Sequence, residues 1–137
     1  MISDALARDL RDAGLRWDAA PGDRFRIEAD ALSDEVFTLS EMTIEAHAFP
    51  TGTVLGFNGT TEWALDSVPQ EEALWLPRED QLRDLLGRTF RSLGRGEDGY
   101  EVRTGDGESE DAVFTATEPA DAYAKAVLDL IHHAVDE

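Results

Sequence analysis

The chain has 137 residues, of which 42% are hydrophobic, and this length and composition predict a single globular domain over residues 1–137. There is no cysteine, which excludes disulfides, thiolate metal sites and cysteine nucleophiles. Thirty acidic residues against twelve basic ones give a formal net charge of −18. A charge of that sign repels nucleic acid, so we expect no nucleic-acid partner and interpret the acidity as favouring solubility or a basic partner protein.

The N-terminal residues MISDALARDLRDAGL carry acids and bases in an amphipathic pattern, without the continuous apolar run of a signal peptide. No apolar segment in the sequence approaches the length of about 18 residues that a membrane span requires. We therefore expect a cytoplasmic protein with no membrane partner.

The first predicted element is a helix that begins after Ser3 and ends at Gly14. Ser3 can cap it, and Leu6, Leu10 and Ala13 recur at helical spacing. A strand is predicted next over 24–28, where Phe25 and Ile27 alternate with charged residues.

In the middle of the chain, apolar and polar residues alternate in the way that is typical of β-strands. Segment 36–40 places Phe37 and Leu39 on one face, and segment 42–48 places four apolar residues on one face opposite polar ones. A turn at 50–52 leads into a strand over 53–57.

A hairpin is predicted at Asn58-Gly59, because a type I′ turn needs two residues that tolerate positive φ. The returning segment 60–67 is then a strand in which Trp63 and Leu65 share a face. A helix over these residues remains open, since Glu62 to Leu65 include no β-branched side chain.

A second helix is predicted from Pro77, at its first position, to Gly87, with a buried stripe of Leu82, Leu85 and Leu86. Strands follow over 89–93, 100–104 and 112–117. The last helix begins near Pro119. The residues that it is expected to bury are Tyr123, Val127, Leu130, Ile131 and Ala134.

Helices separated by hairpin-connected strands are typical of the α+β class. We therefore expect a mainly antiparallel sheet of about six or seven strands with three helices packed on it in a layered sandwich.

No metal site or cofactor is expected from the sequence. His132 and His133 are neighbours near a helix C-terminus, point about 100° apart and suit the helix dipole better than one shared ion. His47 lies on the polar face of a strand. The carboxylate-rich segment 96–111 lacks the order of a calcium-binding EF-hand, so we interpret it as a solvated hairpin.

No catalytic motif is present in the sequence. The serines lack the G-x-S-x-G context of a hydrolase nucleophile, and there is no G-x-x-x-x-G-K-[ST] phosphate loop. Glu62 and Asp66 share a face as either helix or strand, but an acid/base pair also needs a desolvated carboxyl group.

The candidate binding region is the segment from Asn58 to Arg78. It contains Trp63 and Trp75 next to a polar turn and an arginine, and tryptophan is enriched at protein interfaces. The alternative is that both tryptophans complete the core. The predicted binding residues are Asn58, Trp63, Trp75 and Arg78.

Two strings, FNGTTEWALDSV and LWLPREDQLRDLLG, followed by FRSL and DAYAKAV, resemble a family of small uncharacterised bacterial proteins, some of which carry the name pilus assembly protein CpaE. The ATPase of that name is much larger and has a phosphate loop, which this chain lacks, so the resemblance implies no activity. WLPREDQL also resembles part of phage-encoded proteins with an α/β/α sandwich, which implies only a layered architecture.

From the sequence we expect a non-catalytic module that binds a protein or small ligand through the Asn58–Arg78 region. The first alternative is an acidic antagonist of a basic protein, such as an immunity protein for a nuclease toxin, because the charge of −18 favours fast association with a basic partner. A second alternative is a carboxylate-based enzyme, with or without the assistance of a metal ion.

Overall fold

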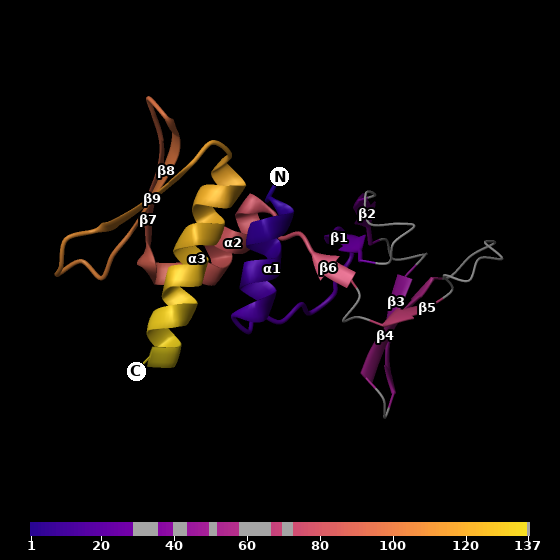
Figure 1. Ribbon diagram of the computed structural model, residues 1–137. Coiled ribbons are helices and arrows are strands. Elements are labelled where there is room, and N and C mark those ends of the chain that lie inside the picture. The colour runs from indigo at the N-terminus through magenta and orange to yellow at the C-terminus, as the bar shows by residue number, and fades with distance from the viewer. Residues whose placement is uncertain (29–35, 40–43, 50–51, 58–66, 70–72, 137) are drawn as a thin grey trace. The chain divides into compact units, whose positions relative to one another are not determined.

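The computed structural model describes residues 1–28, 36–39, 44–49, 52–57, 67–69 and 73–136, and it confirms the α+β class (Figure 1). The described residues form three α-helices and three antiparallel sheets of three strands each. The chain divides into two compact units: unit 1 comprises Met1–Arg16 and Pro77–Glu137, and unit 2 comprises Trp17–Leu76. The prediction of one domain over the whole chain stays a prediction.

Unit 1 combines the three helices with one sheet, in which the strand order is β7-β8-β9. Helix α3 contacts α1, α2, β8 and β9, and Figure 1 shows it between the sheet and α1. The elements of unit 1 are α1 (Asp4–Asp12), α2 (Glu79–Leu86), the short 3-10 helix η2 (Gly87–Thr89), β7 (Phe90–Gly96), β8 (Gly99–Thr104), β9 (Ala112–Ala116) and α3 (Pro119–Asp136).

Helix α1 begins and ends where the sequence predicts. The Ser3 Oγ accepts a 3.3 Å hydrogen bond from the Leu6 N–H, which caps the N-terminus. Gly14, with φ of 109°, follows the C-terminus in a conformation that suits glycine. The Ser3 N–H also donates to Asp121 at 2.7 Å, which ties this end of α1 to the start of α3.

Helix α2 differs from the prediction at two residues. Its first helical residue is Glu79 and its N-cap is Arg78, so Pro77 precedes the helix instead of starting it. Leu82 and Leu86 are buried as predicted, but Leu85 is 40% exposed. In eight residues the apolar stripe is narrow, and Leu85 lies outside the part that faces α3.

Helix α3 supplies six of the twelve buried hydrophobic residues that the structure describes in unit 1. Tyr123 and Val127 are buried as predicted, and the sheet contributes Val102, which is 0% exposed. Leu130 and Ile131 are half-buried, and Ala134 is exposed, contrary to the prediction. The burial therefore weakens toward the C-terminal end of α3.

Unit 2 contains two sheets, with strand orders β2-β1-β6 and β3-β4-β5. Strand β1 pairs with β6 from the far end of the unit, and Phe25 lies opposite Trp75. The strands of unit 2 are β1 (Arg24–Ile27), β2 (Val36–Thr38), β3 (Ile44–Phe49), β4 (Gly52–Phe57), β5 (Ser67–Pro69) and β6 (Ala73–Trp75).

The core described in unit 2 lies on the β2-β1-β6 sheet. Phe25, Ile27, Leu39 and Ala73 are buried together. Trp17, Ala19 and Phe37 pack against this cluster. The predicted shared face of Phe37 and Leu39 is therefore confirmed.

The prediction of a single sheet of six or seven strands was wrong, because the described strands form three separate sheets. Hairpin signals identify neighbours along the chain, but whether one meander continues into the next depends on long-range pairing such as β1 with β6. Asn58 to Asp66 lie outside the described residues, so the choice between strand and helix there stays open. Gly56 pairs with Ser67, which is not the register that a two-residue Asn58-Gly59 hairpin would give.

Within the part of the chain that the structure describes, no helix has both the length and the apolar character needed to cross a bilayer.

Candidate functional site: an acidic pocket in unit 1

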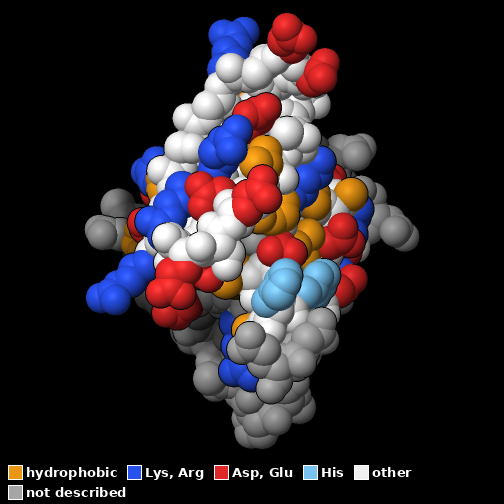
Figure 2. Space-filling view, turned by 90° about the vertical axis from the view of Figure 1, so that its left-hand side faces the viewer, with side chains coloured by type: hydrophobic (Ala, Val, Ile, Leu, Met, Phe, Trp, Pro, Cys, Tyr) orange, Lys and Arg blue, Asp and Glu red, His pale blue; other side chains and the backbone are white. Residues whose placement is uncertain are grey.

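A pocket of about 370 Å³ opens in unit 1 at one end of the β7-β8-β9 sheet. It is formed by the end of α2, the connection between β8 and β9, and the C-terminal half of α3. The lining residues are Leu86, Thr89, Thr104, Gly105, Asp106, Ser109, Glu110, Ala112, Ala126, Asp129, Leu130 and His133. On the face drawn in Figure 2, carboxylates border a strip of hydrophobic side chains, and histidines lie at the end of that strip.

Asp106 organises the loop side of the pocket. Its Oδ1 accepts hydrogen bonds from the backbone N–H groups of Glu108 and Ser109, each at 2.8 Å. These two donors, with that of Ser109 the stronger, lower the pKa of Asp106 below its ordinary value. The Asp106 carboxylate is therefore ionised at neutral pH, and the loop is held in a turn around it.

Two contacts at Gly105 connect this loop to its surroundings. The Gly105 N–H donates to the Thr89 carbonyl at 2.8 Å, which continues the β7–β8 ladder into the loop. A Cβ at Gly105 would collide with the Asp111 carboxylate, so a larger residue at this position would require the Asp111 side chain to move.

Helix α3 forms the opposite side. Ala126, Asp129, Leu130 and His133 follow the i, i+3, i+4, i+7 spacing of one helical face. The His133 Nδ1 lies 2.8 Å from the Asp129 carbonyl oxygen, and because a carbonyl only accepts, Nδ1 carries the proton. The same nitrogen is 3.4 Å from the Asp129 carboxylate, so His133 stays beside that acid.

The pocket therefore has an apolar floor and an acidic rim. Leu86, Ala126 and Leu130 supply hydrocarbon, and three carboxylates, those of Asp106, Glu110 and Asp129, supply negative charge. Its described lining includes no Lys or Arg. No group of three or more potential metal ligands comes together within the described ranges. The arrangement suits an organic cation with a hydrocarbon stem better than a bare metal ion.

The four residues predicted to bind are distributed differently. Asn58 and Trp63 lie outside the described residues. Trp75 belongs to unit 2, where its ring stacks on Trp17 with centroids 6.5 Å apart and an interplanar angle of 8°. Trp75 is half-buried among the core aromatics, so in the described structure it serves packing.

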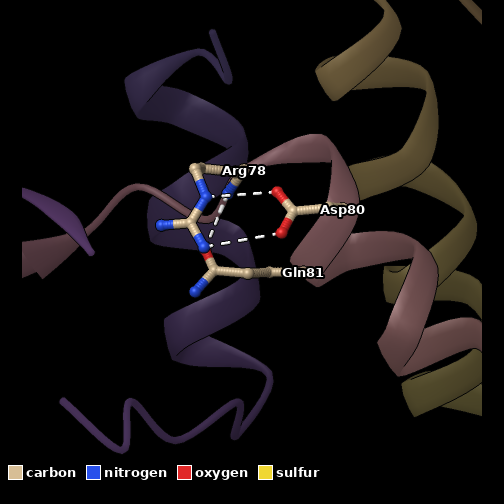
Figure 3. Close-up of polar contacts among 3 residues, drawn as sticks. All are labelled: Arg78, Asp80 and Gln81. Carbon is tan, nitrogen blue, oxygen red and sulfur yellow. Dashed lines mark hydrogen bonds and ion pairs between the residues drawn. The ribbon is translucent and has the colours of Figure 1, made fainter. Parts of the chain in front are cut away.

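Arg78 belongs to unit 1, at the N-terminus of α2 (Figure 3). Its N–H donates to the Gln81 Oε1 at 2.9 Å, and its guanidinium Nε lies 3.1 Å from Asp80 Oδ1. The hydrogen bond from Arg78 lowers the pKa of Asp80. These contacts cap the helix, and the predicted set of four residues stays a prediction as a binding site.

The histidines and acids singled out in the sequence also have defined places. His132 and His133 are exposed near the C-terminus of α3. The side chain of His47 and residues Glu62 and Asp66 lie outside what the structure describes. Segment 96–111 is divided by β8, so its acids do not form one continuous loop.

Sequence reasoning missed the pocket because its walls come from three separate segments. The turn at Asp106 has a local signal, since an Asp before Gly often accepts from backbone two residues on. Nothing local indicates that this turn lies opposite Asp129 of α3.

No family model matches the chain, and searches of the curated proteins and of the solved structures likewise find no match. The resemblance to the small bacterial family therefore stays a prediction.

Proposed function

We propose that the chain is a non-catalytic binding module for a positively charged protein, and that the unit 1 pocket receives a Lys or Arg side chain of that partner. The observation that carries the proposal is the pocket of about 370 Å³ with three carboxylates and no basic residue in its described lining. This volume is at the small end of the range for ligand pockets, which suits one long side chain.

The chemistry of the lining supports a Lys or Arg occupant. Such a side chain packs its methylene stem on apolar surface and keeps its charged end among polar groups. Leu86, Ala126 and Leu130 offer the surface for the stem, and the rim carboxylates offer acceptors for the charged end. A neutral or anionic occupant would bring no positive charge to the three carboxylates of the rim.

The net charge of −18 supports the same kind of partner. A large negative field raises the association rate of a basic protein and makes the rate sensitive to salt. This is the behaviour expected of an acidic antagonist that neutralises a basic protein. The Asn58–Arg78 region remains a predicted second contact for the partner.

The test titrates the full chain with hexalysine and follows backbone amide shifts by NMR at low and high salt. We expect the amides of Asp106 to Glu110 and of α3 near Asp129 to shift. The variant Asp106→Asn/Glu110→Gln/Asp129→Asn should bind at least about tenfold more weakly, which corresponds to about 1.4 kcal/mol. Asn at 106 keeps an oxygen for the two loop N–H groups, so the turn is preserved.

The matched control is Asp9→Asn/Asp84→Asn/Glu97→Gln, which removes the same charge from exposed residues that do not line the pocket. Equal weakening in both variants would show diffuse attraction and contradict the pocket proposal, as would the absence of binding to the unchanged chain. Because the pKa of Asp106 is lowered, its negative charge should persist as the pH falls from about 7 to about 5. A loss of binding over that range in a His133→Ala variant, which has no imidazole beside Asp129 to take up a proton, would also contradict the proposal.

A further inference from the structure

Among the residues that the structure describes, strand β7 is an edge of the unit 1 sheet that pairs with β8 alone. It is the terminal strand in the order β7-β8-β9, and every residue from Arg91 to Gly96 is exposed. Helix α3 packs on β8 and β9. On the other edge strand, β9, the Thr115 carbonyl already accepts a 2.7 Å hydrogen bond from the Lys125 Nζ.

The hydrogen bonds around Phe90 show which backbone groups of β7 point outward. The Gly105 N–H donates to the Thr89 carbonyl, and the Phe90 N–H donates to the Gly87 carbonyl. In an antiparallel ladder, this pattern marks Phe90 and Thr104 as a pair whose backbone groups point away from each other.

The same orientation recurs along the β7 edge. Strand β8 runs against β9 without a register shift, so Val102 and Tyr100 repeat the orientation of Thr104 at every second residue. Their partners on β7 are Leu93 and Arg95. The N–H and C=O groups of these two residues therefore point to the outer edge, beyond the irregularity at Arg91.

The side chains of β7 add an apolar contact and a positive charge to this edge. Leu93 is 38% exposed although Val102, its partner on the same face, is 0% exposed. Residues 85 to 96 include Arg88, Arg91 and Arg95 and no acid, in a chain with a net charge of −18. Residues 85 to 96 therefore carry three positive charges and no acid of their own, although the carboxylates of Glu101 and Asp111 lie beside Gly96 and Gly105.

We propose that β7 binds an extended acidic segment of a partner protein as an added strand, through the backbone of Leu93 and Arg95. An unpaired edge is a template for strand addition, and the main-chain hydrogen bonds of the added strand provide affinity. A second copy of β7 is disfavoured, because pairing β7 with itself would bring arginines against arginines. An acidic segment instead places carboxylates beside Arg91 and Arg95. Leu93 and Arg95 do not line the acidic pocket, whereas the Arg91 guanidinium lies near Gly105 and Gly107 of the loop that forms one of its walls.

The experiment selects a phage-displayed random heptapeptide library on the immobilised full chain. We expect enrichment of peptides rich in Asp and Glu, because the irregularity at Arg91 places its side chain and that of Arg95 on different faces of the strand. A synthetic peptide of the enriched sequence should shift the backbone amides of Leu93 and Arg95 in the NMR spectrum of the full chain. Absence of enrichment, or enrichment of basic peptides, would overturn the proposal.

Two variants test the mechanism with that synthetic peptide. Arg95→Pro removes an outward N–H, a change that edge strands tolerate, and should weaken binding at least about tenfold. Arg91→Glu/Arg95→Glu leaves the backbone intact, so it decides the question if the proline variant unfolds, and it should weaken binding as much. The matched control is Arg16→Glu/Arg83→Glu, at exposed arginines outside β7, with an expected change under about twofold. Unchanged binding by the β7 charge variant, or equal loss in the control, overturns strand addition at β7.

Discussion

The indole N–H of Trp17 donates a 2.8 Å hydrogen bond to the Oδ2 of Asp23, a carboxylate that is only 3% exposed. The Ala20 N–H donates to the same oxygen at 3.0 Å. The backbone of Asp23 continues this connection, because its carbonyl accepts from the Leu39 N–H at 2.8 Å. Asp23 thus ties the segment that enters unit 2 to the end of strand β2.

We expect Asp23→Ala to lower the free energy of unfolding by about 1–3 kcal/mol, because it leaves the part-buried indole N–H of Trp17 and the backbone N–H of the exposed Ala20 without their acceptor. Trp17→Phe keeps an aromatic ring but removes one donor, so it should lower the free energy of unfolding by less than Asp23→Ala does. Urea unfolding followed by circular dichroism measures both.

Asp18→Ala, at an exposed acid in the same segment, is the control and should change the unfolding free energy by less than about 0.5 kcal/mol. If Asp23→Ala matches this control, the carboxylate does not stabilise unit 2.

Gly99 begins β8 with φ of 132°, and a Cβ there would collide with the Ala116 carbonyl on β9. We expect Gly99→Ala to lower the unfolding free energy by about 1–3 kcal/mol, because both the backbone conformation and the β8–β9 pairing are strained. The control is Gly94→Ala on β7, where a Cβ meets nothing within 4 Å. The unfolding free energy of that variant should be unchanged or higher by up to about 1 kcal/mol. Thermal and urea unfolding compare the two, and an equal response would contradict this account of Gly99.

The Tyr123 hydroxyl is buried and has no hydrogen-bond partner within the described parts of the chain, and its ring packs 5.7 Å from that of Phe90. Tyr123→Phe keeps the ring and removes an unsatisfied polar group. We therefore expect the unfolding free energy to rise by about 1 kcal/mol. Tyr100→Phe, at a half-buried ring, should change it by less than about 0.5 kcal/mol. A loss of stability in Tyr123→Phe would indicate that the hydroxyl is satisfied by water.

The elements that the sequence predicted well are those with a local physical signal. Ser3 caps α1 because its hydroxyl reaches the N–H three residues on, and Gly14 follows the helix because it accepts positive φ. Strands β7, β8 and β9 overlap the predicted strands over 89–93, 100–104 and 112–117, although β7 continues to Gly96. The predicted burial of Leu85 was wrong, because helical spacing defines an apolar stripe but not how much of that stripe a neighbouring helix covers.

The candidate site could not be predicted from the sequence for a related reason. Trp75 was singled out for its residue type, but only the pairing of β1 with β6 places it against Phe25 and beside Trp17. The pocket joins Asp106 to Asp129 across the β8–β9 connection and α3, and no sequence spacing relates those two residues. The residue types were visible in the sequence, whereas their proximity was not.

The sequence by itself determined the α+β class, the ends of α1, the strands of unit 1, the absence of cysteine chemistry and the charge of −18. Each of these follows from composition or from interactions within a few residues along the chain. The tertiary structure decided that the described strands form three sheets and that β7 is the terminal strand of one of them. It also decided that Asp23 is buried and accepts a hydrogen bond from Trp17. Those outcomes depend on contacts between residues far apart in the sequence, whose formation is a property of the whole packed chain.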